Sequence, residues 1–170
     1  MGAANGHNKT PRRILSILVN NEFGVLSRIS GLFSGRGFNI ESLCVAETLD
    51  PEVSNMTIAT SGDEQIIEQI IKHLRKLIPV IKVTDLTELA YVSREMVLVK
   101  VHAEGDARAE AMRLSEIFRG RIVDAAQKSL TIEVTGDDEK IQAFLDLIRP
   151  LGVKEIARTG KIAMARAQKG

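Results

Sequence analysis

Apolar positions near the start of the chain predict a strand that is followed directly by a helix. Residues 14–19, which read ILSILV, form a short aliphatic run bounded by turn-forming residues, and this is typical of a buried strand. From Val25 to Phe33, apolar residues recur at helical spacing while polar residues occupy the other positions. The glycines of Gly35-Arg36-Gly37 predict the end of this helix.

A hairpin, a second helix and a further strand follow. Residues 40–60 read as an approximate strand, a turn around a proline, and a strand in which apolar and polar residues alternate. Ser61-Gly62-Asp63-Glu64 has the spacing of a capping box and precedes a strongly apolar helical stripe that Pro79 closes. Residues 80–86 supply a fourth strand. The order βαββαβ therefore extends over residues 12–87.

The second half of the chain repeats this order. The segment 57–64 (TIATSGDE) is echoed by 131–138 (TIEVTGDD), and 32–36 (LFSGR) by 117–121 (IFRGR). The repeat predicts an α+β protein built from two tandem ferredoxin-like domains. Its expected elements are a strand at 96–102, a helix at 107–118, a hairpin at 122–126 and 130–135, a helix at 138–148, and a final extended segment at 153–165.

These patterns divide the chain into four parts. Residues 1–11 show no periodicity and are predicted to be a disordered leader. Residues 12–87 form the first domain, 88–95 a linker with a hinge, and 96–170 the second domain.

The junction between the first strand and the first helix is the candidate functional site. A helix that begins here leaves several first-turn N–H groups without partners, and such an end attracts a carboxylate or a phosphate. Gly24 has no Cβ, so a ligand can approach its backbone, and Asn21 adds an amide that both donates and accepts. Spacing alone leaves open that this is only a turn with a cap. The corresponding segment of the second half, 103–107, lacks the pattern, so we place the ligand site in the first domain only.

Composition and motifs argue against catalysis. Three histidines are scattered, the one cysteine, Cys44, lies in an apolar strand, and no nucleophile, Walker or metal-binding motif occurs. Acidic pairs lie in predicted first turns, where the helix dipole explains them. With no secretory signal and no apolar run long enough to cross a membrane, we expect a cytoplasmic protein without metal sites or membrane contacts.

An RNA-binding or small-ligand module is the alternative function, because RNA-recognition domains share the βαββαβ order. Those domains stack bases on aromatic residues of their central strands. Here the predicted strand 53–60 has no aromatic residue, and the net charge of +1 shows no basic excess. We therefore expect no nucleic-acid partner.

Several segments of the first half carry a resemblance to a known family. They read RRILS at 12–16, NEFGVLSR at 21–28, LFSGRGFNIESL at 32–43 and MTI at 56–58. The chain resembles the small regulatory subunit of acetolactate synthase (acetohydroxyacid synthase), over residues 12 to about 165. The first domain is similar to an ACT domain, an amino-acid-sensing module, and the second to the family's C-terminal ferredoxin-like domain. Phe23 and the leader depart from the shared pattern.

The resemblance implies a non-catalytic subunit that activates the catalytic subunit and confers feedback inhibition by valine in branched-chain amino acid biosynthesis. It implies a homodimer through the ACT domain, with the effector at the interface. Since one methylene in an apolar cavity changes binding by only about 1–3 kcal/mol, we expect leucine and isoleucine to compete with valine. No cofactor is expected in this chain. The catalytic partner is expected to bind thiamine diphosphate and magnesium, with FAD as a further candidate cofactor. The implied effector-binding residues are Asn21, Glu22, Phe23, Gly24, Val25 and Leu26, with Asn39 and Ile40 of the neighbouring protomer and Ala46 facing the branched side chain.

Overall fold

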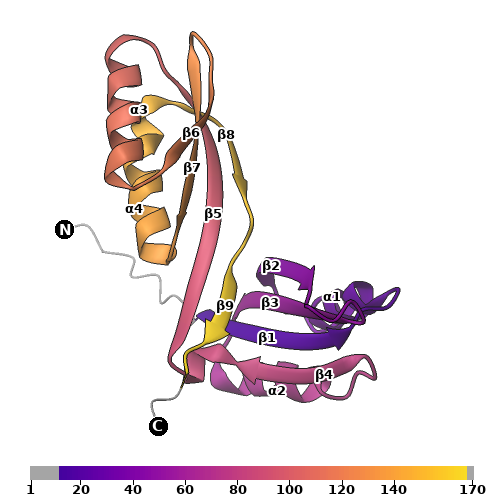
Figure 1. The fold of residues 1–170 in the computed structure, drawn as a ribbon. Coiled ribbons are helices and arrows are strands. Elements are labelled where there is room, and N and C mark those ends of the chain that lie inside the picture. The colour runs from indigo at the N-terminus through magenta and orange to yellow at the C-terminus, as the bar shows by residue number, and fades with distance from the viewer. Residues whose placement is uncertain (1–11, 168–170) are drawn as a thin grey trace, which may run out of the picture. The chain divides into compact units, whose positions relative to one another are not determined.

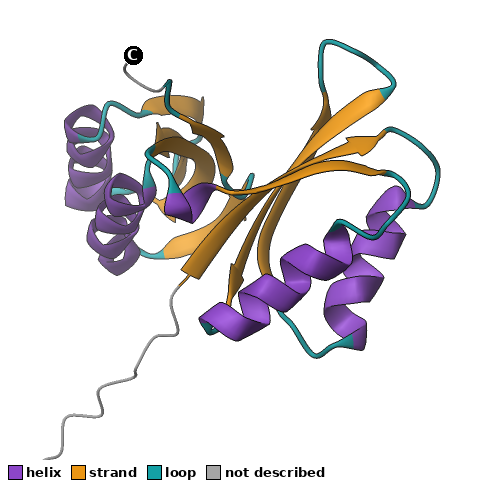
Figure 2. Cartoon of the chain, turned by 90° about the horizontal axis from the view of Figure 1, so that it is seen from below, coloured by secondary structure: helices purple, strands orange, loops and turns teal. Residues whose placement is uncertain are grey.

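The computed structural model describes residues 12–167, which fold into two compact units. The first unit contains the described residues up to Tyr91 and from Ala163 onward, and the second contains Val92–Ile162. The predicted leader at 1–11 lies outside the described residues. In each unit two helices cover one face of an antiparallel sheet (Figures 1 and 2). Both units have the predicted βαββαβ order.

The first unit is a four-stranded sheet with strand order β2-β3-β1-β4. Every neighbouring pair in this sheet is antiparallel, and β2 and β4 are its edges. Its elements are β1 Arg12–Asn20, α1 Val25–Gly35, β2 Ile40–Glu47, β3 Val53–Ser61, α2 Glu64–Leu74, β4 Val80–Asp85 and the short 3₁₀ helix η1 Leu86–Glu88.

Alternation along the strands separates the two faces of this sheet. Ile17 of β1, Met56 of β3 and Val83 of β4 point toward the helices and belong to the core. Ile29 and Phe33 of α1 complete the same core from the helical side. The neighbouring residues on each strand therefore lie on the opposite face, which the helices leave uncovered.

The second unit repeats this arrangement with strand order β6-β7-β5-β8. Its core joins Val97, Val99 and Val101 of the central strand to Phe144 of the last helix. Its elements are β5 Tyr91–His102, α3 Gly105–Ile117, β6 Arg121–Ala125, β7 Ser129–Gly136, α4 Asp138–Ile148, η2 Arg149–Leu151 and β8 Val153–Arg158. The last strand, β9 Ile162–Ala165, pairs with β5 and from Ala163 onward belongs to the first unit.

The internal repeat corresponds to equivalent helix caps. Asp63 caps α2, since its carboxylate accepts a hydrogen bond from the Ile66 N–H, and Asp137 caps α4 by accepting from the Lys140 N–H. Both bonds span the three residues that the capping spacing predicts.

Three segments have other bounds in the structure than the sequence predicts, although the division between the units, after Tyr91, falls inside the predicted linker. The expected linker at 88–95 is partly strand, because β5 begins at Tyr91 and the Arg166 N–H donates to the Ala90 carbonyl at 2.8 Å. The expected segment 153–165 is two strands, and its last residues group with the first unit instead of the second domain predicted at 96–170. The second helix ends at Leu74 and does not continue to Pro79. After Leu74 the backbone N–H groups of Lys76 and Leu77 donate to carbonyls three residues earlier, as in a 3₁₀ turn, and not four residues earlier as in an α-helix. None of the described helices is long and apolar enough to cross a membrane.

Candidate functional site

The turn between β1 and α1 has an unusual backbone at Gly24. This residue occupies the N-cap position of α1 with a φ of 80°, in the left-handed region. A Cβ built at Gly24 would meet no atom within 4 Å apart from those of its chain neighbours. The glycine is therefore required by its dihedral angles, and the space in front of it is open.

The first turn of α1 leaves its amide groups without acceptors. The N–H groups of Phe23, Gly24, Leu26 and Ser27 donate to no described residue, and the Val25 N–H reaches the Glu22 carbonyl only at 3.4 Å. No side chain caps α1, and its first turn holds no acidic residue, whereas aspartates cap α2 and α4. Such a helix end presents convergent donors and the positive end of a dipole to an anion.

Asn21 is fixed at the edge of this turn by the β2–β3 connection. Its Nδ2 donates to the Pro51 carbonyl at 2.9 Å and to the Glu47 carboxylate at 3.1 Å, and its backbone N–H donates to the Glu52 carbonyl at 2.7 Å. The Asn21 Oδ1 accepts no hydrogen bond from the described residues. An acceptor oxygen and a nearby carboxylate are the groups that an ammonium requires.

The other predicted residues of the turn have different surroundings. Phe23 is fully exposed and Leu26 is 41% exposed, while Val25 is 7% exposed and packs in the core. Val25 can therefore offer a ligand its backbone alone. Glu22 is paired with Arg28 at 3.2 Å, so its carboxylate is held by a cation.

Asn39 and Ile40 lie at the far end of β2 from Asn21. Ile40 pairs with Thr60, whereas Ala46 pairs with Asn55 at the end of β2 that adjoins Asn21. The Asn39 carbonyl accepts a hydrogen bond from the Thr60 hydroxyl at 2.7 Å. At about 3.4 Å per residue, the two ends of β2 are roughly 24 Å apart. One protomer therefore brings together the turn and Ala46, but not Asn39 and Ile40.

The corresponding turn of the second unit is unsuited to an anion. Glu104 precedes α3 without capping it and pairs with Lys128 at 3.4 Å and with His102 at 3.2 Å. Asp106 adds a second carboxylate in the first turn. The prediction that this turn lacks the pattern of the first is consistent with these contacts.

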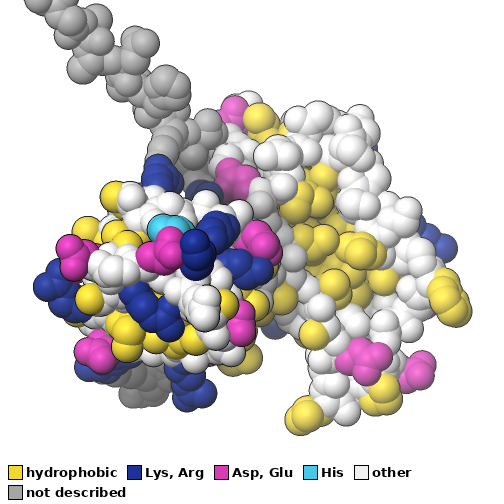
Figure 3. Space-filling view, turned by 90° about the horizontal axis from the view of Figure 1, so that it is seen from above, with side chains coloured by type: hydrophobic (Ala, Val, Ile, Leu, Met, Phe, Trp, Pro, Cys, Tyr) yellow, Lys and Arg dark blue, Asp and Glu magenta, His cyan; other side chains and the backbone are white. Residues whose placement is uncertain are grey.

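No group of His, Cys, Asp and Glu among residues 12–167 is arranged to hold a metal ion. The pKa of His73 is lowered by desolvation and by the positive charges of the nearby Arg36 and Lys76. No carboxylate contributes to this shift. On the face shown in Figure 3, basic and acidic side chains are interspersed, and neither forms a continuous patch.

Sequence comparisons agree with this picture. A family model described as the AHAS small subunit-like ACT domain matches residues 15–82, and one described as the small subunit of acetolactate synthase matches residues 94–167. The chain is 50% identical over 156 residues to the acetolactate synthase small subunit of Aquifex aeolicus, which covers 91% of this chain and 81% of that protein. The chain belongs to the acetolactate synthase small-subunit family.

Further members of the family match over nearly their full length. The acetolactate synthase isozyme 3 small subunit of Escherichia coli is 50% identical over 93% of this chain and 98% of its own. The crystal structure of the small subunit from Thermotoga maritima superimposes with a TM-score of 0.85 at 42% identity, over 94% of this chain and 99% of that one. The prediction of two tandem ferredoxin-like domains, the first an ACT domain, is confirmed.

Two features of the candidate site were not predicted from the sequence. The Ser27 amide was not among the predicted binding groups, although its position in the first turn of α1 implies it. The second is the hydrogen bond from Asn21 to the Glu47 carboxylate, which depends on the path of the β2–β3 turn. The types of these two residues and their spacing in the sequence do not indicate that they are in contact.

Proposed function

We propose that this chain is a non-catalytic regulatory subunit that activates the acetolactate synthase catalytic subunit and makes it sensitive to valine. Membership of the small-subunit family supports association with a catalytic subunit. The chain itself carries no cofactor in this proposal, and thiamine diphosphate chemistry belongs to the partner. The observation that carries the proposal is the uncapped, unobstructed N-terminus of α1 at Gly24.

Valine fits the groups at this turn. Its carboxylate accepts from the amides of Gly24, Leu26 and Ser27, where charge-assisted hydrogen bonds to backbone N–H groups are strong. Its ammonium lies by the Asn21 Oδ1 and the Glu47 carboxylate. Ala46 precedes Glu47 on β2 and provides a small, exposed wall for the branched side chain.

A second copy of the chain completes the site in this proposal. β2 is an edge strand whose outer backbone groups pair with no described strand. If two β2 strands pair antiparallel about a two-fold axis, Ile40 of one copy comes next to Glu47 of the other. This symmetry would bring Asn39 and Ile40 of one copy to the turn at Asn21 of the other. Within a single protomer these residues lie at opposite ends of β2.

The site needs only modest energies to regulate an enzyme. One methylene in an apolar cavity changes binding by about 1–3 kcal/mol, so leucine and isoleucine compete with valine. Allosteric coupling of about 1–3 kcal/mol suffices for feedback. Because the ligand would lie between two copies, it can favour one arrangement of the two sheets over another.

Calorimetry with valine on the purified chain tests the binding proposal. Saturable heat at millimolar valine is expected, with the dimer verified by sedimentation in the same buffer. An intact dimer that gives no heat and no thermal shift would contradict the site. Adding the chain to the purified catalytic subunit then tests regulation, since acetolactate formation should rise and should become sensitive to valine. Retention on an RNA column at moderate salt would instead favour a nucleic-acid module.

A further inference from the structure

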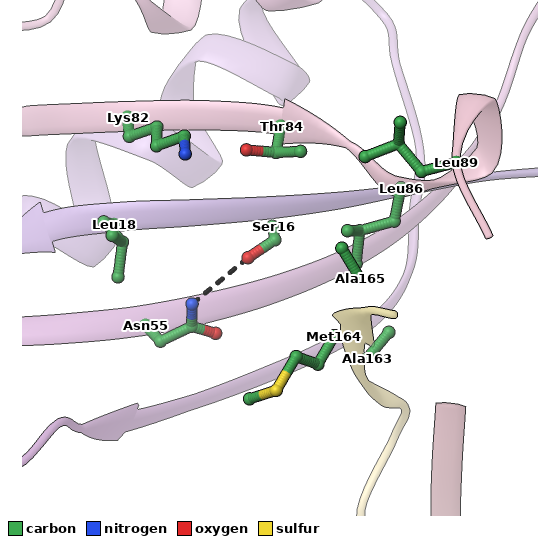
Figure 4. A pocket seen from close by; sticks show the side chains of 10 residues that line it. All are labelled: Ser16, Leu18, Asn55, Lys82, Thr84, Leu86, Leu89, Ala163, Met164 and Ala165. Atoms are coloured by element: carbon green, nitrogen blue, oxygen red, sulfur yellow. Dashed lines mark hydrogen bonds between the residues drawn. The ribbon is translucent and has the colours of Figure 1, made fainter. Parts of the chain in front are cut away.

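The uncovered face of the first unit's sheet contains a cavity of about 300 Å³. Its floor comes from three adjacent strands and its wall from η1 and the C-terminal strand β9 (Figure 4). This volume is at the lower end of the range for small-molecule sites. The lining residues are Ser16, Leu18, Asn55, Lys82, Thr84, Leu86, Leu89, Ala163, Met164 and Ala165.

The polar side chains of the floor are brought together by strand register. Ser16 pairs with Thr84, and Leu18 pairs with both Lys82 and Asn55, so all five lie on one face. The Asn55 Nδ2 donates to the Ser16 hydroxyl oxygen at 3.1 Å, which leaves the Ser16 hydrogen free to donate outward. In Figure 4 the Lys82 ammonium group points toward the Thr84 hydroxyl. One ammonium and two hydroxyls therefore line the same part of the cavity.

Among the described residues that line the cavity, the one charged side chain is that of Lys82, which is positive. Lys82 makes no ion pair or hydrogen bond with any described residue. No acidic side chain from residues 12–167 lines the cavity. Around the polar group, the lining is aliphatic, with leucines near both ends and alanines on β9. Met164 of β9 is 72% exposed, and its flexible thioether can adapt to a ligand.

We propose that this cavity binds a small organic anion, a monocarboxylate with a short aliphatic body. Its carboxylate would accept hydrogen bonds from Lys82, Thr84 and Ser16, and its hydrocarbon part would lie against Leu86, Leu89 and Met164. This site is separate from the turn at Gly24, which contributes no residue to the lining. It therefore stands independently of the valine proposal.

Methyl NMR on the 170-residue chain tests the proposal, with hexanoate as the probe. The chain has five methionines, and a methyl label reports on Met164 in the wall and on Met112 of α3 as an internal reference. Hexanoate should shift the Met164 methyl saturably at millimolar concentration and leave Met112 unchanged. Hexanamide, which has the same shape without the charge, should bind about tenfold more weakly.

Variants locate the charge that selects the anion. Lys82→Gln should weaken hexanoate binding about tenfold, and Lys82→Arg should retain it. Lys154→Gln, which removes an exposed lysine of β8, is the matched control and should bind as the unaltered chain does. The proposal is overturned by an unshifted Met164 methyl, by equal binding of hexanamide, or by full binding in Lys82→Gln. A shift that disappears in Asn21→Ala and persists in Lys82→Gln would place the anion at the α1 turn and would also refute it.

Discussion

Substitution of Gly24 by Asp separates effector binding from folding. Gly24 adopts a φ of 80°, and an L residue in this region costs about 1–2 kcal/mol. Apart from the adjoining residues of the chain, no atom lies within 4 Å of the added Cβ, so no steric clash adds to this strain. An aspartate at an N-cap position recovers up to about 1 kcal/mol by accepting from the free amides of α1. The net loss of stability should therefore be about 1 kcal/mol, which a domain of ordinary stability tolerates.

The effect on valine should be much larger. The new carboxylate occupies the amides of Leu26 and Ser27, which the effector would otherwise use. Two carboxylates about 4 Å apart repel by about 1 kcal/mol in water and by about 4 kcal/mol in a partly shielded site. Together with the lost charge-assisted hydrogen bonds, a loss of about 3 kcal/mol is expected, which is about a hundredfold in affinity.

The assay is a valine titration of acetolactate formation by the reconstituted complex. Gly24→Asp should still activate the catalytic subunit and should lose valine inhibition. Gly24→Asn is the matched control, because asparagine tolerates the left-handed region and has the same shape without the charge. It should lose roughly tenfold in valine sensitivity. If Gly24→Asp remained inhibited at the original valine concentration, the effector would bind elsewhere.

Three further predictions concern the stability of the described residues, each measured by chemical denaturation. Asp63→Ala and Asp137→Ala should each cost about 1 kcal/mol, since both remove an N-cap, and markedly unequal costs would contradict their equivalence. Arg158→Met should cost about 2 kcal/mol, because it leaves the buried Glu95 carboxylate without its bidentate partner; the value is reduced since the Arg158 side chain is 45% exposed. Lys100→Met breaks the exposed pair with Glu155 and should cost less than Arg158→Met. The lowered pKa of His73 means that the unfolded chain binds the proton more tightly, so stability should fall as pH drops below 6.5, and His73→Gln should reduce that fall.

Local signals in the sequence predicted the elements of the fold well. The change from a strand pattern to a helical one at Val25 marks the start of α1, and the capping spacing at Asp63 and Asp137 marks the starts of α2 and α4. These signals succeed because a cap and an amphipathic stripe are determined within a few residues of the chain.

The missed features depend on contacts distant in sequence. β5 begins at Tyr91, next to the hydrogen bond from the Arg166 N–H to the Ala90 carbonyl, and β9 pairs with β5; no local pattern contains these contacts. The cavity at Lys82 exists because registers across three strands place its polar residues together. Asn39 lies far from Asn21 because β2 runs antiparallel to β3, which places Ile40 beside Thr60 at the other end of the sheet. The spacing of these residues in the sequence does not reveal this separation.

A mixed dimer tests most directly whether two copies share the effector site at the α1 turn. Asn21→Ala and Asn39→Ala should each abolish valine binding in a homodimer, since each site needs Asn21 from one copy and Asn39 from the other. In a heterodimer of the two variants, one site carries both substitutions and the other carries neither. Calorimetry should then recover valine binding at one site per dimer with the original affinity. Heterodimers of verified composition that bind no valine would contradict the shared site.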